Sequence, residues 1–271
     1  MPMRCPARAV YHLHMSAPDQ PTESSRHLRI VLVGTQHPGN IGSAARAMKT
    51  MGLHDLVLVA PERFPHAEAD ALAAGADDVL AAARVVDAVE QAVADCVQVF
   101  GCTARDRRIA LPQHAPREAV AQLHTAAAQG PVALLFGCER TGLDNAELQR
   151  CHAAVHIPAN PAYSSLNLAA AVQILCYEWR LQQLASGLVV GVPGDDGREP
   201  AASHAQLEGF FGQLHDTLDA IDFHKGRTPE AAMHKLRRLF LRAGLDAREV
   251  RLLRGVLADA QRMARLAAER D

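Results

Sequence analysis

Short apolar runs alternate with amphipathic stretches along most of the chain, starting at residue 28. Short apolar runs that end at turn residues are typical of buried strands. Strands are expected at Leu28–Val33, Leu56–Ala60, Val97–Gly101, Val132–Phe136 and Ala154–Ile157. Helices are expected between and after them, including one from near Asn40 and others over Asp87–Ala94, Arg117–Ala127 and Leu168–Leu184. This alternation predicts an α/β fold with a mainly parallel sheet.

The two flanks of this region have a different character. Residues 1–27 mix Pro, Ser, His and Arg without periodicity and lack an apolar signal-peptide core, which predicts a disordered tail. Residues 187–204 are rich in Gly, Pro and Asp, as linkers are. Amphipathic stretches over about 205–223, 229–243 and 246–267 predict a small helical extension. The expected organisation is an α/β domain over 28–186, a linker over 187–204 and a helical extension over 205–271.

Composition narrows the class of protein. The chain has 271 residues, 49% of them hydrophobic, which is enough for one sizeable domain and one small one. No 18-residue apolar run free of charges occurs, so no membrane span is expected. The six cysteines form no CxxC pair and no Cys/His pattern of a zinc site, so no metal is expected and a reducing cytoplasm is the expected compartment. The net charge of −2 gives no global attraction for nucleic acid, so any phosphate contacts must come from local patches.

The segment 158–169 carries the densest polar chemistry, because prolines, a tyrosine and two serines immediately precede an apolar helix. Ser164 or Ser165 is a natural N-cap, and Asn167 is expected one turn into the helix. A rigid polar cup at a helix N-terminus suits a ligand with oxygen acceptors or a carboxylate. On these residues alone, an ordinary capped helix after a proline-rich turn is the stronger interpretation.

Two further blocks add polar residues after apolar strands. In the first, a strand ends at Gly34 and leads into a helix for which Asn40 is a plausible N-cap. Gly42 and the alanines that follow are expected to let this helix pack closely on the sheet, and helical spacing returns Arg46 to the face of Asn40 and Gly42. In the second block, a strand ends near Gly137 and the sequence Cys-Glu-Arg-Thr-Gly follows as a glycine-bounded turn.

Familiar glycine motifs do not explain these blocks. The stretch from Gly34 to Gly39 has the spacing of a P-loop, but Asn40 stands where the phosphate-binding lysine is needed. No GxGxxG, GxSxG or HExxH string occurs, which argues against dinucleotide-binding, hydrolase and zinc-protease sites. An α/β enzyme acting on a small nucleotide is therefore the least favoured class.

Taken together, the three blocks resemble the three motifs of the SpoU branch of the SPOUT RNA methyltransferases. The strings are HPGNIGSAARAMKTMGL, ERTGL followed by NAELQRCH, and ANPAYSSLNLAAAVQ, and their order and spacing also agree. The segments 233–240 (MHKLRRLF) and 253–255 (LRG) resemble a helical extension carried by tRNA-modifying members. The resemblance covers nearly all of the chain beyond residue 27. It implies a deep trefoil knot in the sheet domain, and a homodimer that forms through the knot.

The resemblance implies S-adenosylmethionine as the cofactor, held mostly by backbone groups of three loops. The matching positions are Cys102, Thr103, Ala104, Gly137, Ile157, Ser164, Ser165 and Leu166. The chain has Gly-Cys-Thr-Ala-Arg where the family pattern has Gly-Thr-Ser-Ala-Arg. Cys102 therefore removes a side-chain hydroxyl contact but leaves the backbone role of the loop intact.

The resemblance also implies which side chains serve methyl transfer to a ribose 2′-hydroxyl. Arg46 matches an arginine proposed to help deprotonate the hydroxyl, although a guanidinium holds its protons far above neutral pH. The weaker hypothesis is that Arg46 clamps the target phosphate and ribose while another group accepts the proton. Asn40 and Asn167 would orient Arg46 and the ribose, Ser165 would bond the hydroxyl or phosphate, and Glu139 would brace the motif loops.

The expected partners are tRNA and a second copy of the chain. The helical extension favours a tRNA methyltransferase acting on cytidine or uridine 32 of the anticodon loop. The alternatives are a methyltransferase of ribosomal RNA and an RNA-binding protein without turnover. Basic residues of the extension are candidates for phosphate contacts, although a solvated helix face explains them equally well: Lys235, Arg237, Arg238 and Arg242. An apolar stripe is a candidate dimer face, and core packing explains it equally well: Leu143, Ala169, Val172 and Leu175.

Overall fold

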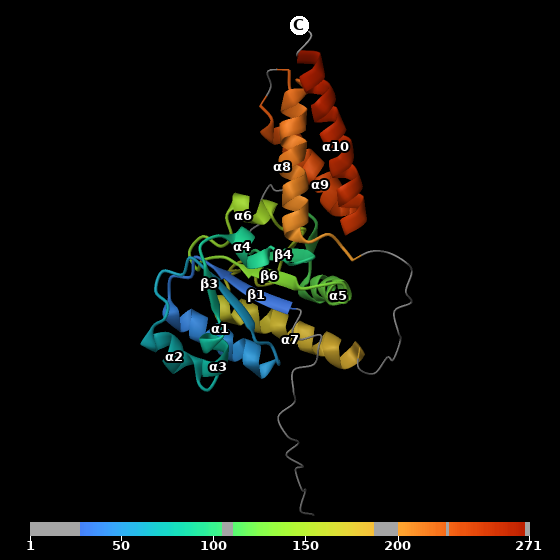
Figure 1. The fold of residues 1–271 in the computed structure, drawn as a ribbon. Coiled ribbons are helices and arrows are strands. Elements are labelled where there is room, and N and C mark those ends of the chain that lie inside the picture. The colour runs from blue at the N-terminus through green and yellow to red at the C-terminus, as the bar shows by residue number, and fades with distance from the viewer. Residues whose placement is uncertain (1–27, 105–110, 187–199, 226–227, 269–271) are drawn as a thin grey trace, which may run out of the picture.

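The computed structural model describes residues 28–104, 111–186, 200–225 and 228–268. The predicted tail and most of the predicted linker lie outside the described residues. Figure 1 shows a twisted sheet with helices on both faces and a stack of three further helices standing against one side of it.

Seven strands within the described residues form one sheet, in the order β3-β2-β1-β6-β4-β7-β5, and every pair is parallel. The strands are β1 (Leu28–Val33), β2 (Asp55–Val59), β3 (Arg84–Val86), β4 (Gln98–Cys102), β5 (Gln113–His114), β6 (Val132–Phe136) and β7 (Ala153–Val155). The prediction of an α/β fold with a parallel sheet is confirmed. The prediction missed β3 and β5, because strands of two or three residues are too short to show a periodic pattern.

The helices follow the expected alternation. They are α1 (Pro38–Thr50), α2 (Ala67–Ala73), α3 (Asp77–Ala81), α4 (Val89–Val93), α5 (Pro116–Ala126), α6 (Asn145–Gln149), α7 (Leu168–Ser186), α8 (His204–Ala220), α9 (Glu230–Ala243) and α10 (Ala247–Ala268). The three stretches predicted beyond residue 204 are all helical, with ends shifted by three residues or fewer.

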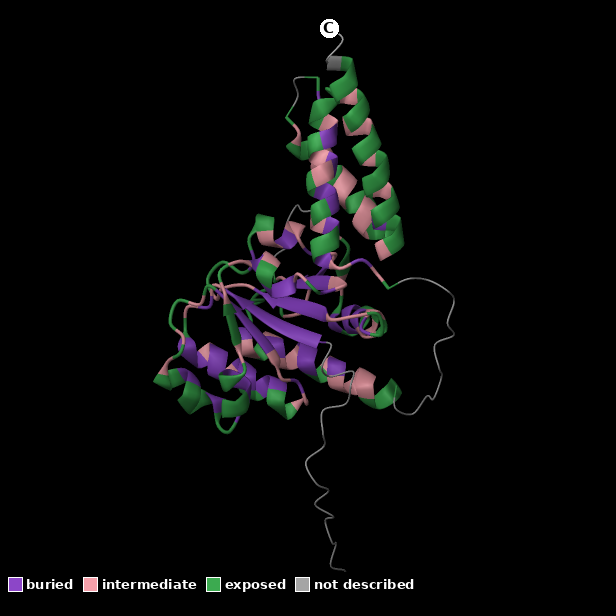
Figure 2. Cartoon of the chain, viewed as in Figure 1, coloured by how far each residue is buried: buried purple, intermediate pink, exposed green. Residues whose placement is uncertain are grey.

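Alternate residues of each strand enter two separate cores, one on each face of the sheet. On β1, Ile30 and Leu32 face the core made with α1, α2, α3, α5 and α7, whereas Val31 and Val33 face the core made with α4 and α6. Both faces are therefore covered, as parallel sheets require. Figure 2 shows the resulting band of buried strands between two helical layers. No helix of the described residues is long and apolar enough to cross a membrane.

The helices α8, α9 and α10 enclose a small core of their own. Phe210 and Phe211 of α8 pack against Phe240 of α9, with the rings of Phe210 and Phe240 edge to face at 4.8 Å. Leu253 and Leu257 of α10 complete this cluster. Just before α8, a β-bridge pairs Ala201 with Asp246, and the side chain of Ser203 caps α8. The extension is thus a packed unit and not a string of isolated helices.

One expected packing contact is different in the structure. The helix α1 begins at Pro38 and places Gly42 against α2, where an added Cβ would lie 2.0 Å from the carbonyl oxygen of Ala69. The glycine therefore permits a close approach between two helices, whereas Ala44 and Ala45 face the sheet core. The expectation that Gly42 packs on the sheet was wrong, because sequence spacing does not show which neighbour a helix face meets.

Candidate active site

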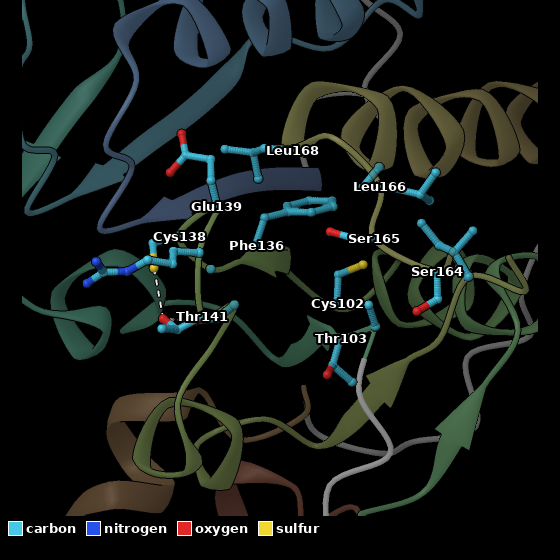
Figure 3. A pocket seen from close by; sticks show the side chains of 16 residues that line it. Cys102, Thr103, Phe136, Cys138, Glu139, Thr141, Ser164, Ser165, Leu166 and Leu168 are labelled. Carbon is cyan, nitrogen blue, oxygen red and sulfur yellow. Dashed lines mark hydrogen bonds between the residues drawn. The ribbon is translucent and has the colours of Figure 1, made fainter. Parts of the chain in front are cut away.

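A pocket opens at the carboxyl ends of three neighbouring strands, β4, β6 and β7. Because all strands are parallel, the loops that follow them emerge at the same edge of the sheet. The chain between β7 and α7 closes the pocket from the side opposite the β6 loop (Figure 3). The pocket is lined by Cys102, Thr103, Ala104, Phe136, Gly137, Cys138, Glu139, Arg140, Thr141, Gly142, Ile157, Ser164, Ser165, Leu166, Leu168 and Ala171.

The structure brings together all eight positions that the resemblance marked for the cofactor. They come from three strand ends and the approach to α7, although they are spread over more than sixty residues of sequence. The resemblance did not mark Phe136, Cys138, Arg140 and Thr141, which line the same pocket. For Cys138, Arg140 and Thr141, the sequence signal was the glycine-bounded turn after β6. Gly142 closes this turn by donating a backbone hydrogen bond to Cys138 O at 2.8 Å.

The carboxylate of Glu139 ties the β6 loop to the loop between β1 and α1. Its Oε2 accepts a hydrogen bond from Gln36 N at 3.0 Å, and its Oε1 accepts from His37 N at 3.2 Å and from Asn40 Nδ2 at 2.8 Å. Asn40 Oδ1 in turn accepts from Asn167 Nδ2 at 2.9 Å. One chain of hydrogen bonds therefore joins the three sequence blocks.

Two predicted helix caps are corrected by these contacts. His37, not Asn40, occupies the N-cap position of α1, and the Asn40 side chain is engaged across the loops instead. At α7, Asn167 Oδ1 accepts from the backbone of Ala169 at 2.9 Å and of Ala170 at 3.3 Å, so Asn167 is the cap and lies before the helix, not one turn into it. Ser164 and Ser165 are consequently not caps and line the pocket.

The hydrogen bonds around Glu139 determine its charge. Burial alone would raise the pKa of this carboxyl, but the bond from Asn40 and those from the backbone of Gln36 and His37 outweigh it and hold the pKa below its usual range. Glu139 is therefore an anion at neutral pH. Its fixed negative charge lines the pocket and is joined through Asn40 to Asn167, the cap of α7.

Two cysteines of the pocket differ in acidity. Burial raises the pKa of the Cys102 thiol to about 12, so it stays protonated and acts as a small apolar wall residue. Burial would also raise the pKa of Cys138, but its hydrogen bonds with the Thr141 hydroxyl, at 2.9 Å, and with backbone groups of the turn outweigh burial and lower the pKa.

Arg46 has the exposure that its predicted role requires, whereas Arg237 does not. Arg46 is exposed on α1, is not among the pocket-lining residues, and makes no hydrogen bond or ion pair within the described part of the chain. It is thus available to a ligand outside the pocket. Arg237, predicted to contact RNA, is instead turned inward between α8 and α9, where it pairs with Glu208. Lys235, Arg238 and Arg242 are exposed.

The apolar stripe considered as a dimer face belongs mainly to the protomer core. Leu143 is 1% exposed, and Val172 and Leu175 are completely buried against the sheet. Only Ala169 keeps part of its surface. Core packing explains the stripe, so these leucines and valine are not available for contact with a second chain.

Comparison with known proteins identifies the family. Residues 27–177 match the model of the SpoU rRNA Methylase family, and residues 205–269 match the model of the C-terminal domain of the tRNA methyltransferase TrmJ. A tRNA (cytidine/uridine/adenosine-2′-O-)-methyltransferase TrmJ from Pseudomonas aeruginosa is 49% identical over 88% of this chain and 95% of that protein. A tRNA (cytidine/uridine-2′-O-)-methyltransferase TrmJ from Salmonella typhimurium is 48% identical over 87% of this chain and 97% of that protein.

Solved structures agree with this assignment. The crystal structure of TrmJ from Z. mobilis superposes with a TM-score of 0.73 at 37% identity, covering 85% of this chain and 97% of the other. A methylase family protein from Haemophilus influenzae gives a TM-score of 0.57 at 40% identity, covering 90% and 99%. The chain therefore belongs to the SpoU rRNA Methylase family, and within that family to the TrmJ methyltransferases.

Proposed function

We propose that this protein transfers a methyl group from S-adenosylmethionine to a ribose 2′-hydroxyl of tRNA. The observation that carries the proposal is the convergence of the loops after β4, β6 and β7 on one pocket, whose lining residue Glu139 is joined through Asn40 to Asn167 by hydrogen bonds. The TrmJ relatives, matched along both the sheet domain and the helical extension, support tRNA as the substrate class.

The pocket has the chemistry that this cofactor requires. Phe136, Leu166 and Leu168 supply apolar walls for a planar base, and the loops after β4 and β6 supply backbone groups for polar edges. A side chain at Gly137 would lie 2.0 Å from Leu143 N, so only glycine lets the β6 loop fold this closely on itself. The bound cofactor supplies an electrophilic methyl group on a positively charged sulfur. The Glu139 carboxylate, which lines the pocket, would favour a positively charged ligand there.

The task of the chain's own residues is to align the hydroxyl and to accommodate its proton. Methyl transfer would form a C–O bond to the ribose, break the S–C bond of the donor and release one proton from the hydroxyl. Arg46, exposed in the C-terminal half of α1, binds the phosphate and ribose of the target nucleotide. Its guanidinium stays charged, so the proton passes to a phosphate oxygen or to water. Alignment of the reacting atoms accounts for most of the rate enhancement.

Ser165 and Asn167 complete the substrate side of the site. Both are exposed at the approach to α7, and Ser165 also lines the pocket. The Ser165 hydroxyl bonds the ribose hydroxyl or the adjoining phosphate. The Asn167 amide spans Asn40 and the first turn of α7, which fixes the loop that carries Ser165.

We infer cytidine or uridine 32 of the anticodon loop as the target nucleotide, on the basis of the family resemblance. The exposed cations Lys235, Arg238 and Arg242 on α9 contact phosphates of the anticodon stem-loop, so binding weakens as salt rises. We further propose that the sheet domain is knotted and that the active form is a homodimer formed through that domain, in the cytoplasm. A molecular mass equal to one chain at micromolar concentration would count against the dimer.

The test of the function is methyl transfer from labelled S-adenosylmethionine into unmodified bulk tRNA, followed by nuclease digestion and mass mapping. A 2′-O-methylated cytidine or uridine at the start of the anticodon loop supports the proposal. Labelled ribosomal RNA with unlabelled tRNA would instead assign the chain to the ribosomal branch of the family. Cofactor binding without incorporation into either RNA would leave an RNA-binding protein without turnover.

The role of Arg46 is tested with two variants. Arg46→Ala should lower kcat by at least about a hundredfold, because the hydroxyl loses its alignment. Arg63, exposed outside the pocket, offers a matched control, and Arg63→Ala should keep wild-type kinetics. Wild-type turnover by Arg46→Ala, with normal tRNA affinity, would refute the assignment.

A further inference from the structure

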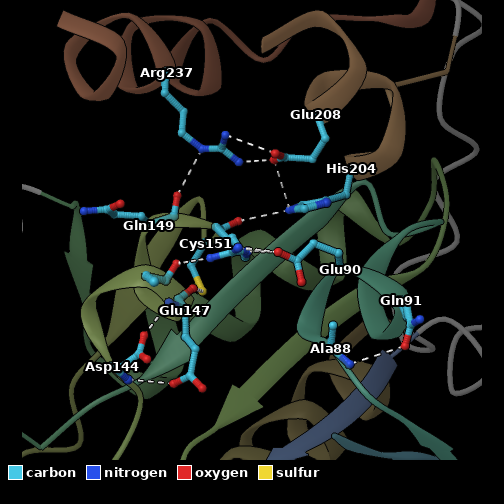
Figure 4. Close-up of polar contacts among 12 residues, drawn as sticks. Ala88, Glu90, Gln91, Asp144, Glu147, Gln149, Cys151, His204, Glu208 and Arg237 are labelled. Atoms are coloured by element: carbon cyan, nitrogen blue, oxygen red, sulfur yellow. Dashed lines mark hydrogen bonds and ion pairs between the residues drawn. The ribbon is translucent and has the colours of Figure 1, made fainter. Parts of the chain in front are cut away.

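A polar bridge joins the helical extension to α6, close to the active site. Arg237 of α9 donates Nε to Gln149 O at 3.2 Å and one guanidinium nitrogen to Glu208 Oε2 at 3.2 Å, with a second contact to Glu208 Oε1 (Figure 4). Its guanidinium also lies over the ring of Phe211, 4.6 Å from the centroid. The side chain is only 18% exposed. Arg237 therefore links its own helix, α9, to two others, α8 and α6.

A second contact from the extension reaches the backbone carbonyl of Arg150, the residue that follows Gln149. The ring of His204, at the start of α8, lies with Nε2 3.3 Å from Arg150 O, and its backbone N donates to Cys96 O at 2.8 Å. Arg150 itself forms an ion pair with Glu90 of α4. The carbonyls at the C-terminal end of α6 thus meet cationic or polar groups from the extension, which is the favourable polarity for a helix C-terminus.

The helix α6 is the direct continuation of the pocket loop. Leu143 follows the turn over residues 138–142, and Asp144 caps α6. An added Cβ at Gly101 would lie 2.8 Å from Leu148 and 2.9 Å from Leu143, so both leucines pack tightly against β4, one residue before Cys102 of the pocket. Tightly packed groups transmit small displacements. The position of α6 therefore sets the position of the turn that lines the pocket.

We propose that Arg237 is a positioning residue for the cofactor pocket and not a phosphate contact. It fixes α6 through Gln149 O, and α6 holds the loop that carries Cys138, Glu139 and Thr141. The identity of the ligand as S-adenosylmethionine rests on the proposed function. The extension then has two separate faces, with an outer one of exposed cations for RNA and an inner one that completes the active site.

The contacts of Arg237 argue against its use on RNA. To reach a phosphate, the guanidinium would have to leave Glu208, and a carboxylate in a half-buried position would lose its partner. The adjoining Arg238 makes no hydrogen bond or ion pair within the described residues and is exposed. It is the natural control, since it has the same chemistry one position away.

The experiment measures binding of S-adenosylhomocysteine, the cofactor product, to the full-length protein by calorimetry. Arg237→Ala should raise its dissociation constant about tenfold, with tRNA affinity at fixed salt within twofold of wild type. Arg238→Ala should leave the dissociation constant unchanged. Arg254→Ala is a second control, because it removes a bond to Gln213 inside the extension, at 2.9 Å, without touching α6. It should lower thermal stability but not cofactor affinity.

Conservative variants separate positioning from simple loss of folding. Arg237→Lys keeps the charge but cannot bond both carboxylate oxygens of Glu208 as a planar guanidinium does. It should therefore recover part of the affinity for S-adenosylhomocysteine that Arg237→Ala loses. Glu208→Gln preserves the size of the side chain but weakens its paired contacts with Arg237. It should shift the dissociation constant in the same direction as Arg237→Ala. Hydrogen exchange of the amides over 138–143 should increase in Arg237→Ala and not in Arg254→Ala.

The opposite pattern would overturn the proposal. Unchanged cofactor affinity in both Arg237→Lys and Glu208→Gln, or weaker tRNA binding with normal cofactor affinity in Arg237→Ala, would return Arg237 to the RNA surface. If the wild-type protein failed to bind S-adenosylhomocysteine at all, the proposed function itself would be wrong. The two failures are therefore distinguishable in one set of measurements.

Discussion

Replacing Glu139 with glutamine tests whether the carboxylate organises the motif loops. Glu139 offers two oxygens to three donors, with Oε1 shared by Asn40 Nδ2 and His37 N, and Oε2 used by Gln36 N. Glutamine has the same size but only one oxygen, and its NH₂ group would face one of these N–H donors. The substitution thus removes a charge and leaves a donor without an acceptor, while changing the shape of the side chain very little.

The expected cost follows from those contacts. An unsatisfied donor and two weakened charge-assisted bonds would cost several kcal/mol in a fully buried site. Glu139 is partly open to solvent, and water recovers part of that loss, so a decrease of about 2 kcal/mol in the free energy of unfolding is expected. For a protein of this size, that corresponds to a fall in Tm of roughly 4–8 °C.

The pH dependence gives an independent check. Because the folded-state pKa of Glu139 is lowered, its stabilising contribution is fully present above its unfolded pKa of about 4.3. The contribution is lost as the pH falls through the folded-state value. The difference in stability between wild type and Glu139→Gln should therefore be full near pH 7 and smaller below about pH 4.

Urea unfolding followed by circular dichroism, at both pH values, measures the difference. Glu62 is exposed and its side chain makes no hydrogen bond or ion pair within the described residues, so Glu62→Gln is the matched control and should behave as wild type. Equal midpoints for wild type and Glu139→Gln near pH 7, or a difference that does not shrink in acid, would refute the reasoning.

Four further predictions concern packing, capping and titration. Gly42→Ala should lower the free energy of unfolding by about 1–3 kcal/mol, because the added Cβ would meet Ala69 O. Gly212→Ala, on the open face of α8, should raise the free energy of unfolding by roughly 0.5–1 kcal/mol. Urea midpoints measure both changes. Asn167→Ala should lower the free energy of unfolding by about 1 kcal/mol, because α7 loses its cap. Asn167→Ser should restore stability but not methyl transfer, since serine caps the helix without reaching Asn40. Equal methyl transfer by Asn167→Ser and wild type would argue against a role for the Asn40 contact. Limited alkylation near pH 8 with peptide mapping should label Cys138 before Cys102, whose pKa is raised to about 12, and the reverse order would contradict the assignment of acidities. Burial lowers the pKa of His152 to about 4, so between about pH 6.5 and pH 4 only the unfolded chain binds a proton at this residue, and the free energy of unfolding rises with pH. His152→Gln should flatten this pH dependence of stability. An unchanged slope would show that other groups cause it.

The sequence was sufficient for the parts of the fold that have a long repeating pattern. The strands over 28–33 and 132–136 have the predicted ends because each is an unbroken apolar run between turn signals. The three helices of the extension were predicted because their amphipathic pattern extends over several turns. The short strands β3 and β5 depend on neighbours already in place, which no local pattern records.

The candidate site was predictable as a set of residues, but not as a set of contacts. Asn40 and Asn167 have good capping chemistry, and only the fold shows that Asn40 bonds to Glu139, 99 residues away, instead. Arg237 belongs to a basic cluster in the sequence, yet burial beside Glu208 separates it from its exposed neighbours. Long-range partners decide both cases, and a single sequence does not contain them.

The position of β6 in the sheet has a consequence for synthesis of the chain. β6 lies between β1 and β4 and pairs with both, yet it follows β1 by about 100 residues. At a translation rate of ~5–20 residues per second, β1 waits roughly 5–20 s with one edge unpaired after it leaves the ribosome. During that interval the nascent chain exposes an apolar parallel strand. The period before β6 arrives is therefore when a chaperone would be of most use to this protein.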